Sequence, residues 1–306
     1  TPVVQGQKTA SERFPGAVDT YCMEALMQDR KALQAGTSHF LGQNFAKASG
    51  IKFQSAAGRE EFAWTTSWGV TTRLIGALVM THSDDDGLIL PPKLAPAQIV
   101  ILPVLQQEEH KAKVLEYCQA LAADLRKVDY HGRRIEVELD TREGRGGDKV
   151  WEWIKKGVPI RIEVGPRDIA SDSVFVGRRD KGPKEKGGQP RAQFLATVAQ
   201  QLDEIQQGLF EKAKAFRAQH TRNIDSKEDF YAYFTPKNEE KPEIHGGFAL
   251  AHWNGDPGIE AKLKDDLNVT IRCIPLAGQH GSEGGEGTCP FSGQPSARRV
   301  VFGKAY

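Results

Sequence analysis

The sequence predicts a multidomain protein of mixed α/β and α+β class. The chain has 306 residues, which is enough for two or three domains. Between about residues 98 and 178, strand-like segments alternate with helical patterns, which is typical of a βαβ-type domain with a mainly parallel sheet. A long polar helical segment then leads to a last unit with three further strand-like segments.

The first unit is expected to extend to about residue 96. Pro91 and Pro92 interrupt any strand there, because proline cannot donate to a strand ladder. The expected elements are a helix at 20–27, a strand at 31–35, a helix at 37–47, an irregular insert, a helix that begins near Arg73 and a strand at 88–90.

The second unit begins with a continuous apolar run at 99–102, as expected of a strand covered on both faces. Apolar residues at helical spacing predict the helix that follows it. The further expected elements are a helix at 107–127, a strand at 134–139, a helix at 148–156, strands at 159–164 and 173–178, a helix at 192–220, and strands at 247–252, 269–274 and 300–303. The predicted domains are 1–96, 97–200 and 226–306, with a linking helix at 201–225.

The overall composition and charge of the chain do not indicate a binding partner. The chain carries 41 Lys and Arg residues against 40 Asp and Glu residues, so any nucleic-acid surface must be a local patch. Four cysteines are scattered without a Cys-x-x-Cys pair, which favours a reducing compartment over a disulfide framework. We expect a cytoplasmic protein, because no apolar run reaches membrane-spanning length and no signal-peptide pattern is present.

Arg73 stands at the start of an apolar helical run. The residues from Leu74 to Met80 leave almost no polar face, so the sequence predicts a helix buried on most sides. Thr71 and Thr72 are suitable N-cap residues. A cation is disfavoured in the first turn of a helix, but a bound anion relieves the conflict, because a helix N-terminus with a guanidinium suits phosphate. Arg73 is therefore either a phosphate ligand or one half of a structural ion pair.

The segment Gln34-Ala-Gly-Thr-Ser-His39 is expected at a strand-to-helix junction. Gly36 would let a ligand approach the backbone, and Thr37 or Ser38 would cap the helix. Gln34, Thr37 and His39 could then face one pocket. The alternative is a capping turn with an ordinary hydrogen-bonded histidine, which is the commoner situation for a single histidine.

A basic stretch at residues 178–191 is a candidate nucleic-acid patch. It holds six basic residues against two acidic ones, together with Gly and Pro, which suits a phosphate backbone. Trp151 and Trp153 add stacking groups of the kind that read single-stranded RNA loops. The alternatives are a solvated loop and two tryptophans that belong to a core.

Other site patterns are weak or absent. The sequence contains no Gly-x-Ser-x-Gly, P-loop, Gly-x-Gly-x-x-Gly or His-Glu-x-x-His motif. Cys289 opens a segment like half of a zinc knuckle, and Cys273 with His252 or His280 could complete an unusual site, but no spacing is standard. We expect unmetallated cysteines, and a merely solvated turn at Asp84-Asp-Asp86.

Taken together, these segments resemble prolyl-tRNA synthetase of the archaeal and eukaryote-like type, a class II aminoacyl-tRNA synthetase. The resemblance covers essentially the whole chain, through long motifs in a fixed order. The motifs are Lys8-Thr, Glu12-Arg-Phe-Pro-Gly-Ala17, Gln34-Ala-Gly-Thr-Ser-His-Phe-Leu-Gly-Gln-Asn-Phe45, Ser67-Trp-Gly-Val-Thr-Thr-Arg-Leu-Ile-Gly76, His82-Ser-Asp-Asp-Asp-Gly-Leu-Ile-Leu-Pro-Pro92, Trp153, Lys156-Gly-Val-Pro-Ile-Arg161, Gly165-Pro-Arg-Asp168, Arg178-Arg-Asp180 and Phe302-Gly-Lys-Ala-Tyr306.

The resemblance implies three regions: the C-terminal part of a class II antiparallel-sheet catalytic domain with motif 3, an α/β anticodon-binding domain, and a small α+β C-terminal domain. For the complete enzyme it implies ATP-dependent formation of prolyl-adenylate and transfer of proline to tRNA(Pro). ATP and Mg would be the cofactors, and the full-length enzyme would be a homodimer with no DNA or membrane partner.

The resemblance also assigns roles to residues. Arg73 matches the motif 3 arginine on the ATP phosphates, and it is the predicted catalytic residue. The other ATP-contacting positions are Gln34, Thr37 and Thr71, and the Gln34 position can also help to hold magnesium. The positions of the proline pocket are His39, Ser67, Trp68 and Gly69. The positions in the region that meets the anticodon are Glu152, Arg167 and Arg178.

Two departures accompany the resemblance. Motifs 1 and 2 and the proline-specifying Thr-x-Glu loop are expected before residue 1, so we expect this chain to be an inactive fragment of a longer enzyme. The family's zinc-ligand positions carry Asn254, Ile259 and Ser292, with Cys289 left, so we expect no zinc. The alternative function is a non-catalytic tRNA- or RNA-binding module derived from a synthetase. A third alternative is an adenylate-forming enzyme that acts on a free small molecule.

Overall fold

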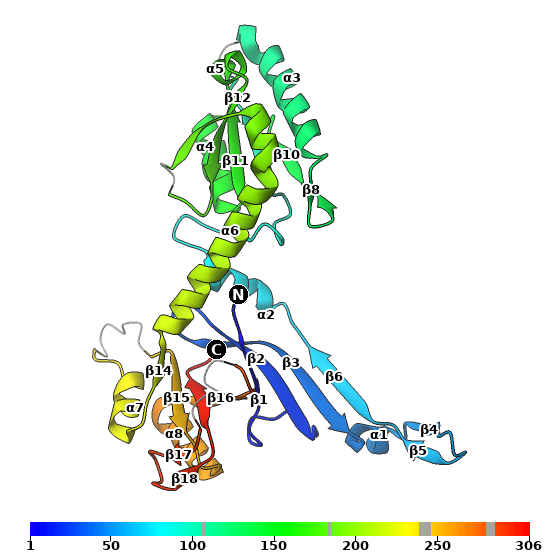
Figure 1. Cartoon of the computed structure of the whole chain (residues 1–306), viewed down its shortest axis with the longest axis vertical. Helices are drawn as coiled ribbons and strands as arrows, with labels where there is room; N and C mark the ends of the chain where they lie inside the picture. The colour runs from blue at the N-terminus through cyan, green and yellow to red at the C-terminus, as the bar shows by residue number, and fades with distance from the viewer. Residues whose placement is uncertain (106–107, 183–184, 239–245, 280–284) are drawn as a thin grey trace. The chain divides into compact units, whose positions relative to one another are not determined.

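The computed structural model describes residues 1–105, 108–182, 185–238, 246–279 and 285–306. The chain divides into two compact units, one formed by Thr1–Thr81 with Ala213–Tyr306 and the other by His82–Lys212 (Figure 1). The first unit therefore combines both ends of the sequence. The domain boundaries expected at residues 96, 200 and 225 stay predictions.

The first unit is built on one eight-stranded sheet with the order β14-β15-β19-β16-β1-β2-β3-β6. All neighbouring strands are antiparallel except β14 and β15. The strands are Val4–Gln7 (β1), Asp19–Leu26 (β2), Ala32–Gly42 (β3), Thr65–Gly69 (β6), Thr221–Asn223 (β14), Phe248–His252 (β15), Thr270–Pro275 (β16) and Arg299–Gly303 (β19). The strands predicted at 247–252, 269–274 and 300–303 are confirmed as β15, β16 and β19.

Two predicted helices of the first unit are wrong. Residues 20–26 fall in strand β2, and residues 37–42 belong to strand β3, so that only the short helix α1 (Asn44–Ser49) remains of the helix predicted at 37–47. The inward face of β2 includes Thr20 and Glu24, which are polar but buried. These polar residues conceal the period-two apolar pattern by which a strand is recognised.

The helix predicted to begin at Arg73 is confirmed as α2 (Arg73–His82), but its predicted burial is wrong. Within α2, Ala77 is buried in a cluster with Met27 and Leu33, whereas Ile75 is 66% exposed. The helix packs on the sheet along one side only, and apolar side chains on its other sides face outward.

The strand predicted at 88–90 is also absent. Leu88 and Leu90 each donate one backbone hydrogen bond, to the carbonyls of residues 155 and 157, and form no strand ladder.

The C-terminal part of this unit covers the sheet with two helices, α7 (Lys227–Phe234) and α8 (Pro257–Leu267). Phe230 packs edge-to-face on Phe302 with ring centroids 5.0 Å apart, and Phe234 lies in the same core. The strands β17 (Gly287–Thr288) and β18 (Pro295–Ser296) form a two-stranded pair in this part, and β4 (Lys52–Gln54) pairs with β5 (Glu60–Phe62) in the N-terminal part of the unit.

A buried ion triad joins the N-terminal and C-terminal strands of this sheet. Glu24 on β2 is fully buried and accepts from Lys8 Nζ at 3.0 Å and from Arg272 Nε, on β16, at 3.1 Å. Lys8 Nζ also donates to the Arg272 carbonyl at 2.7 Å. Each charge of the triad is therefore compensated inside the sheet layer, as buried charges require.

The second unit is a five-stranded sheet with the order β10-β7-β11-β12-β13. Strands β10 (Val137–Leu139), β7 (Ile99–Pro103) and β11 (Ile160–Val164) are parallel, and β12 (Ser173–Arg178) and β13 (Lys186–Pro190) extend the sheet in antiparallel fashion. The predicted mainly parallel sheet is thus a mixed one. The strand predicted at 134–139 is interrupted, because Arg133–Arg134 (β9) pairs with Asp129–Tyr130 (β8) in a separate hairpin.

Helices cover both faces of this sheet. Helices α3 (Glu108–Leu125) and α6 (Arg191–Gln219) contribute to one large core with alternate residues of β7 and β11, and α4 (Gly146–Lys155) packs on the opposite face. These three helices correspond to the helices predicted at 107–127, 148–156 and 192–220, whereas the short α5 (Pro166–Ala170) was not predicted. Figure 1 shows α3, α4 and α6 around the strands.

Candidate functional site

Several residues predicted to contact ATP or proline lie on one face of the large sheet. In the register of β2, β3 and β6, Thr37 stands between Cys22 and Gly69, and His39 stands between Thr20 and Ser67. Residues directly opposite each other in antiparallel strands project to the same face. The side chains of Thr37, His39 and Ser67 therefore share one face, where a ligand would lie on the sheet.

A register irregularity brings Gln34 to that face. Met23 pairs with Gly36, but the next residue, Glu24, pairs with Gln34, so Ala35 is skipped. Such a bulge shifts the alternation by one residue. The side chain of Gln34 therefore lies on the same face as those of Thr37 and His39. All three residues lie within strand β3, so the predicted strand-to-helix junction at 34–39 is wrong.

His39 is held in its neutral form. Its Nδ1 lies 3.0 Å from Thr20 Oγ1, and its ring centroid lies 4.7 Å from that of Phe14. Burial lowers the pKa of His39, because a charged imidazole loses its hydration there. At neutral pH the histidine can therefore orient a polar ligand by hydrogen bonding without adding a charge.

Arg73 opens helix α2 with its side chain exposed. The Thr71 hydroxyl accepts a hydrogen bond from the Arg73 backbone N–H at 3.2 Å, so this threonine caps the helix. No ion pair of Arg73 is found in the described ranges, and its role as a phosphate ligand stays a prediction. Thr71 and Arg73 follow shortly after β6, the strand that carries Ser67.

Trp68 projects from the opposite face of the sheet. It pairs with Ser38, and its side chain is 81% exposed. A cavity of about 520 Å³ lies on this face, and its wall includes Tyr21, Met23 and Trp68. Of the predicted proline pocket, the structure therefore brings His39, Ser67 and Gly69 to one face and the Trp68 side chain to the other.

In the second unit, Arg161 is a buried cation inside strand β11. The residue is only 6% exposed, and its Nη1 atom has no hydrogen-bond partner among the described residues. Burial, and then the neighbouring positive charge of Arg179, lowers the pKa of Arg161. Leaving such a donor without a hydrogen-bond partner is costly, and the neighbouring Glu163 carboxylate offsets part of the effect by raising the pKa of Arg161.

An aromatic ring, Phe175, and a cation, Lys186, lie on the same face of the sheet as Arg161. Glu163 pairs with Phe175 on β12, which in turn pairs with Gly188 on β13, so these positions share the face of Arg161. Lys186 Nζ bonds Glu163 Oε1 at 2.9 Å and lies 5.4 Å from the Phe175 ring centroid. Nothing crowds a side chain placed at Gly188, so a flat group can approach the sheet there.

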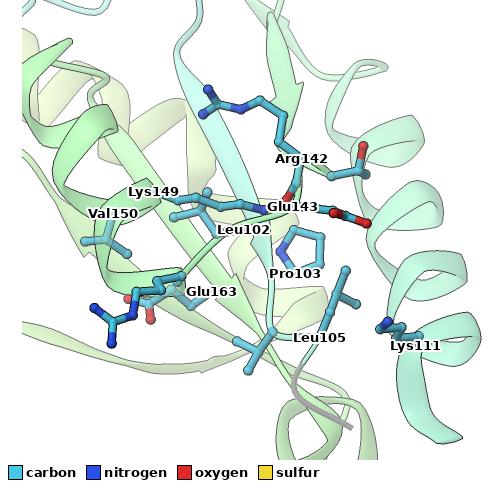
Figure 2. Close-up of a pocket in the computed structure, with 14 residues that line it drawn as sticks. Leu102, Pro103, Leu105, Lys111, Arg142, Glu143, Lys149, Val150 and Glu163 are labelled. Atoms are coloured by element: carbon cyan, nitrogen blue, oxygen red, sulfur yellow. Dashed lines mark hydrogen bonds between the residues drawn. The ribbon is translucent and has the colours of Figure 1, made fainter. Parts of the chain in front are cut away.

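A cavity of about 530 Å³ lies at the carboxyl ends of the parallel strands (Figure 2). Figure 2 shows Pro103 and Leu105 from the end of β7, Lys111 of α3 and Lys149 of α4 around it. This edge is where open α/β sheets bind their ligands. Among the described lining residues, the charged ones are Lys111, Arg142, Arg145, Lys149, Glu143 and Glu163.

Asp140 organises one wall of this cavity. Its buried carboxylate accepts from Arg142 Nη2 at 2.7 Å and from Trp153 Nε1 at 2.8 Å, and Lys149 Nζ lies 3.8 Å away. The Arg142 hydrogen bonds outweigh burial and hold the pKa of Asp140 well below its usual range. Trp153 is therefore part of the packing, while Trp151 is 47% exposed.

The three residues predicted to meet the anticodon lie on separate elements. Glu152 on α4 pairs with Arg142 at 2.9 Å, and Arg167 is exposed on α5. Arg178 ends β12 with its guanidinium bonded to Asp180 at 2.9 Å and Glu204 at 2.8 Å. By strand alternation Arg178 faces away from Arg161, so the structure does not bring these three side chains together. Lys184, in the predicted basic stretch, lies outside the described residues.

No group of three or more potential metal ligands occurs in the described part of the chain. Cys273 and Cys289 are both buried, and His252 Nδ1 lies 3.4 Å from Ser296 Oγ. His280 lies outside the described residues.

The turn at 84–86, which was predicted to be merely solvated, contains an ion pair. The Asp84 carboxylate accepts a hydrogen bond from Arg179 Nη1 at 2.9 Å. Across the described residues, no helix has the length and apolar character needed to span a membrane.

Sequence reasoning missed Arg161, Phe175 and Lys186 as members of one surface. A signal was present for Arg161, because a single cation interrupts the apolar strand 159–164. Lys186 was predicted only as a member of the basic stretch 178–191, and Phe175 gave no signal. Only the pairing of β12 with β13 places these two residues beside Arg161.

Known families and structures match both units of the chain. The model for the anticodon-binding domain matches residues 98–201, and the model for the C-terminal region of prolyl-tRNA synthetase matches residues 238–306. Proline–tRNA ligase 2 of Anaeromyxobacter dehalogenans is 60% identical over the whole chain, which covers 60% of that protein, and proline–tRNA ligase of Bdellovibrio bacteriovorus is 54% identical, with 59% covered.

A solved structure gives the same result. Prolyl-tRNA synthetase from Cryptosporidium parvum, crystallised with L-proline and AMP, superposes with a TM-score of 0.84 at 34% identity, over all of this chain and 60% of that one. The chain thus spans about three fifths of the length of the relatives it matches. These matches assign residues 98–201 to an anticodon-binding domain and residues 238–306 to the C-terminal region of prolyl-tRNA synthetase.

Proposed function

We propose that this chain supplies the ATP-phosphate site and the tRNA-binding surface of a proline–tRNA ligase. The matched relatives carry that name, and the predicted ATP residues Gln34 and Thr37 share one sheet face, while the helix that Arg73 opens packs on the other face. The observation that carries the proposal is the buried Arg161 guanidinium, whose Nη1 atom has no hydrogen-bond partner among the described residues, in a domain of the anticodon-binding type.

The proposed reaction has two steps. The proline carboxylate attacks the α-phosphate of ATP, which forms prolyl-adenylate and releases pyrophosphate. The terminal ribose hydroxyl of the tRNA then attacks the prolyl carbonyl and releases AMP. Arg73 lies at a helix start, where it can offset the charge of the triphosphate, and His39 orients proline as a neutral group.

Magnesium would neutralise phosphate charge when bound. Gln34 fits a supporting role, because its amide oxygen is a hard ligand and its side chain is only partly buried on the ligand face. The described residues offer no carboxylate cluster at this face, so the phosphates themselves would provide most of the ligands.

The RNA surface suits guanine. Proline codons begin with two cytosines, so a proline anticodon contains two adjacent guanines. An arginine reads guanine by donating to its O6 and N7 atoms. Arg161 supplies the unsatisfied donor, and Phe175 with Lys186 supplies a stacking surface and a cation beside it.

Binding of RNA by the 306-residue chain tests this proposal. The chain should bind a transcript of a proline tRNA at least tenfold more tightly than the same transcript with both anticodon guanines replaced, because each lost bidentate contact is worth about 1–3 kcal/mol. Equal affinity for the two transcripts, measured at one salt concentration, would show that the chain does not read the anticodon.

A further inference from the structure

A buried carboxylate on helix α8 holds the loop that joins β1 to β2. Glu260 lies in the first turn of α8 and is only 6% exposed. Its Oε1 atom accepts a hydrogen bond from Thr9 Oγ1 at 2.7 Å, and its Oε2 atom accepts one from Ser11 Oγ. The two hydroxyl oxygens lie 3.2 Å apart. Residues from both ends of the sequence, all within the first unit, therefore meet at this carboxylate.

The hydrogen bonds of Glu260 are directed to the loop and not to the core under α8. Among the described residues no cation forms an ion pair with Glu260, so the two hydroxyls and the N-terminal end of the helix compensate its charge. The apolar packing of α8 comes from Leu263, which is 2% exposed in a core to which no residue of the loop contributes. The role of Glu260 is therefore separable from the stability of α8.

The same loop carries an aromatic ring to His39. Phe14 follows Ser11 by three positions, and its ring centroid lies 4.7 Å from that of His39. The Phe14 backbone N–H donates to Thr20 Oγ1 at 3.3 Å, and the same oxygen lies 3.0 Å from His39 Nδ1. Phe14 is 45% exposed, so burial alone does not fix its ring. The position of the loop therefore determines how the His39 imidazole is packed.

Both ends of the loop are attached to the sheet independently of the carboxylate. The Lys8 backbone N–H donates to the Thr20 carbonyl at 2.8 Å, and the Val18 backbone N–H donates to the Phe40 carbonyl at 2.8 Å. Loss of the carboxylate would release the loop between these two points and leave the strands paired. We therefore expect the aromatic ring to move while the sheet stays folded.

We propose that Glu260 is a positioning residue for the proline pocket, because through Thr9 and Ser11 it holds the loop that orients His39. The proposal rests on the proposed function, in which His39 orients proline. No hydrogen bond or ring contact in the described structure joins this loop to the predicted ATP residues. Glu260 should therefore affect the binding of proline and not that of ATP.

The first test measures proline-dependent pyrophosphate exchange by the full-length protein. Glu260→Leu removes both acceptors, whereas Glu260→Gln keeps an acceptor for Thr9 and offers an amide N–H to the Ser11 hydroxyl. Leu263→Ala is the control for stability, because it weakens the packing of α8 without changing the loop. Asp265→Asn, at an exposed position of the same helix, is the control for charge.

Glu260→Leu is expected to raise KM for proline about tenfold, with kcat and KM for ATP within about twofold of wild type, because only the positioning of bound proline is lost. Glu260→Gln should restore most of the affinity, and Asp265→Asn should behave as wild type. Leu263→Ala should lower Tm without raising KM for proline. An equal rise in KM for both substrates, or the same rise in Leu263→Ala, would show a purely structural role and overturn the proposal.

A second measurement does not depend on activity. Histidine-labelled samples of the 306-residue chain give NMR signals of the imidazoles, and His39→Asn identifies the signal of His39. Phe14→Leu shows how far this signal moves when the neighbouring aromatic ring is removed. Glu260→Leu should move the signal in the same direction, and Leu263→Ala should leave it unchanged. An unmoved His39 signal in folded Glu260→Leu would overturn the proposal.

The two measurements separate failure of the proposed function from failure of this inference. If the full-length wild type shows no proline-dependent exchange, the proposed function fails, and the role of Glu260 in a proline pocket fails with it even where the His39 signal moves. If wild type exchanges normally but Glu260→Leu changes neither KM for proline nor the His39 signal, the proposed function stands and only the positioning role is overturned.

Discussion

Arg161 lies directly opposite Gly177 in the β11–β12 ladder, and its Nη2 is 3.4 Å from the position that a Cβ atom at residue 177 would occupy. The missing side chain leaves room over the guanidinium on the sheet face. An amino acid with a branched side chain at this position would cover the group that we expect to contact RNA.

Gly177→Val is therefore expected to reduce the preference for the guanine-containing anticodon at least fivefold, by an obstruction worth about 1 kcal/mol or more. The fold should persist, because valine favours strands. Gly187→Val is the matched control, since Gly187 pairs with Val176, projects to the opposite face, and has open space around it. Anisotropy titrations with the two transcripts measure the ratio, and an equal loss in both variants would contradict the assignment of this face.

Asp140→Asn is expected to destabilise the second unit by about 2–3 kcal/mol, because Arg142, Lys149 and Trp153 lose a buried charged acceptor. The pKa of Asp140 is depressed in the folded state, so its contribution is present above the unfolded pKa near 3.9 and is lost as pH falls below it.

Urea unfolding at pH 7 and pH 3.5 measures this effect. The difference in unfolding free energy between wild type and Asp140→Asn should shrink at the lower pH. Glu138→Gln, at an exposed position on neighbouring β10, serves as control and should leave both values unchanged. A variant difference that is constant from pH 7 to pH 3.5 would show that the carboxylate charge contributes nothing.

Glu24→Gln is expected to cost about 3–5 kcal/mol in the first unit, because Lys8 and Arg272 would remain buried without their counter-charge. Glu60→Gln removes an exposed pair with Lys52 at 3.0 Å and should cost less than about 1 kcal/mol. Chemical unfolding of both variants makes the comparison, and similar small losses would show that the triad is not what joins β1, β2 and β16.

Arg73→Ala, made in the full-length protein, is expected to reduce proline-dependent pyrophosphate exchange by about two to three orders of magnitude, as for the loss of one preorganised charge on the transition state. Binding of the tRNA transcript should be unchanged, because Arg73 lies in the other unit from Arg161. Normal pyrophosphate exchange by Arg73→Ala would show that Arg73 does not contact ATP. If the wild-type protein also shows no exchange, the alternative of a non-catalytic RNA-binding module is favoured.

The second unit was largely predictable from sequence, because its elements follow strong periodic signals. The apolar run at 99–102 and the helical spacing from Val114 to Leu125 correspond to β7 and α3. The helix at 192–220 corresponds to α6 with its ends displaced by one residue. The local sequence pattern determines whether such a segment forms a helix or a strand, and tertiary contacts determine only how it pairs with its neighbours.

The first unit was not predictable in the same way. Glu24 is buried in β2 because Lys8 and Arg272 compensate it, and Arg272 lies about 250 positions away in the sequence. No local window contains that information. The skipped residue Ala35, which returns Gln34 to the face of Thr37, likewise depends on the pairing of two strands.

The candidate sites divide along the same line. Arg73 was identifiable because a cation at a helix start conflicts with the helix dipole locally. The proposed RNA-binding face was not identifiable, because Arg161, Phe175 and Lys186 come from three strands whose order only the fold defines.

The most direct test of the account measures anticodon discrimination by Arg161→Met. Methionine removes the charge and retains much of the side-chain volume, so Tm should stay equal or rise as a buried cation without a described partner disappears. The account predicts that this variant binds the cognate and the guanine-replaced transcripts with the same affinity, while wild type prefers the cognate at least tenfold. Full discrimination by folded Arg161→Met would contradict it.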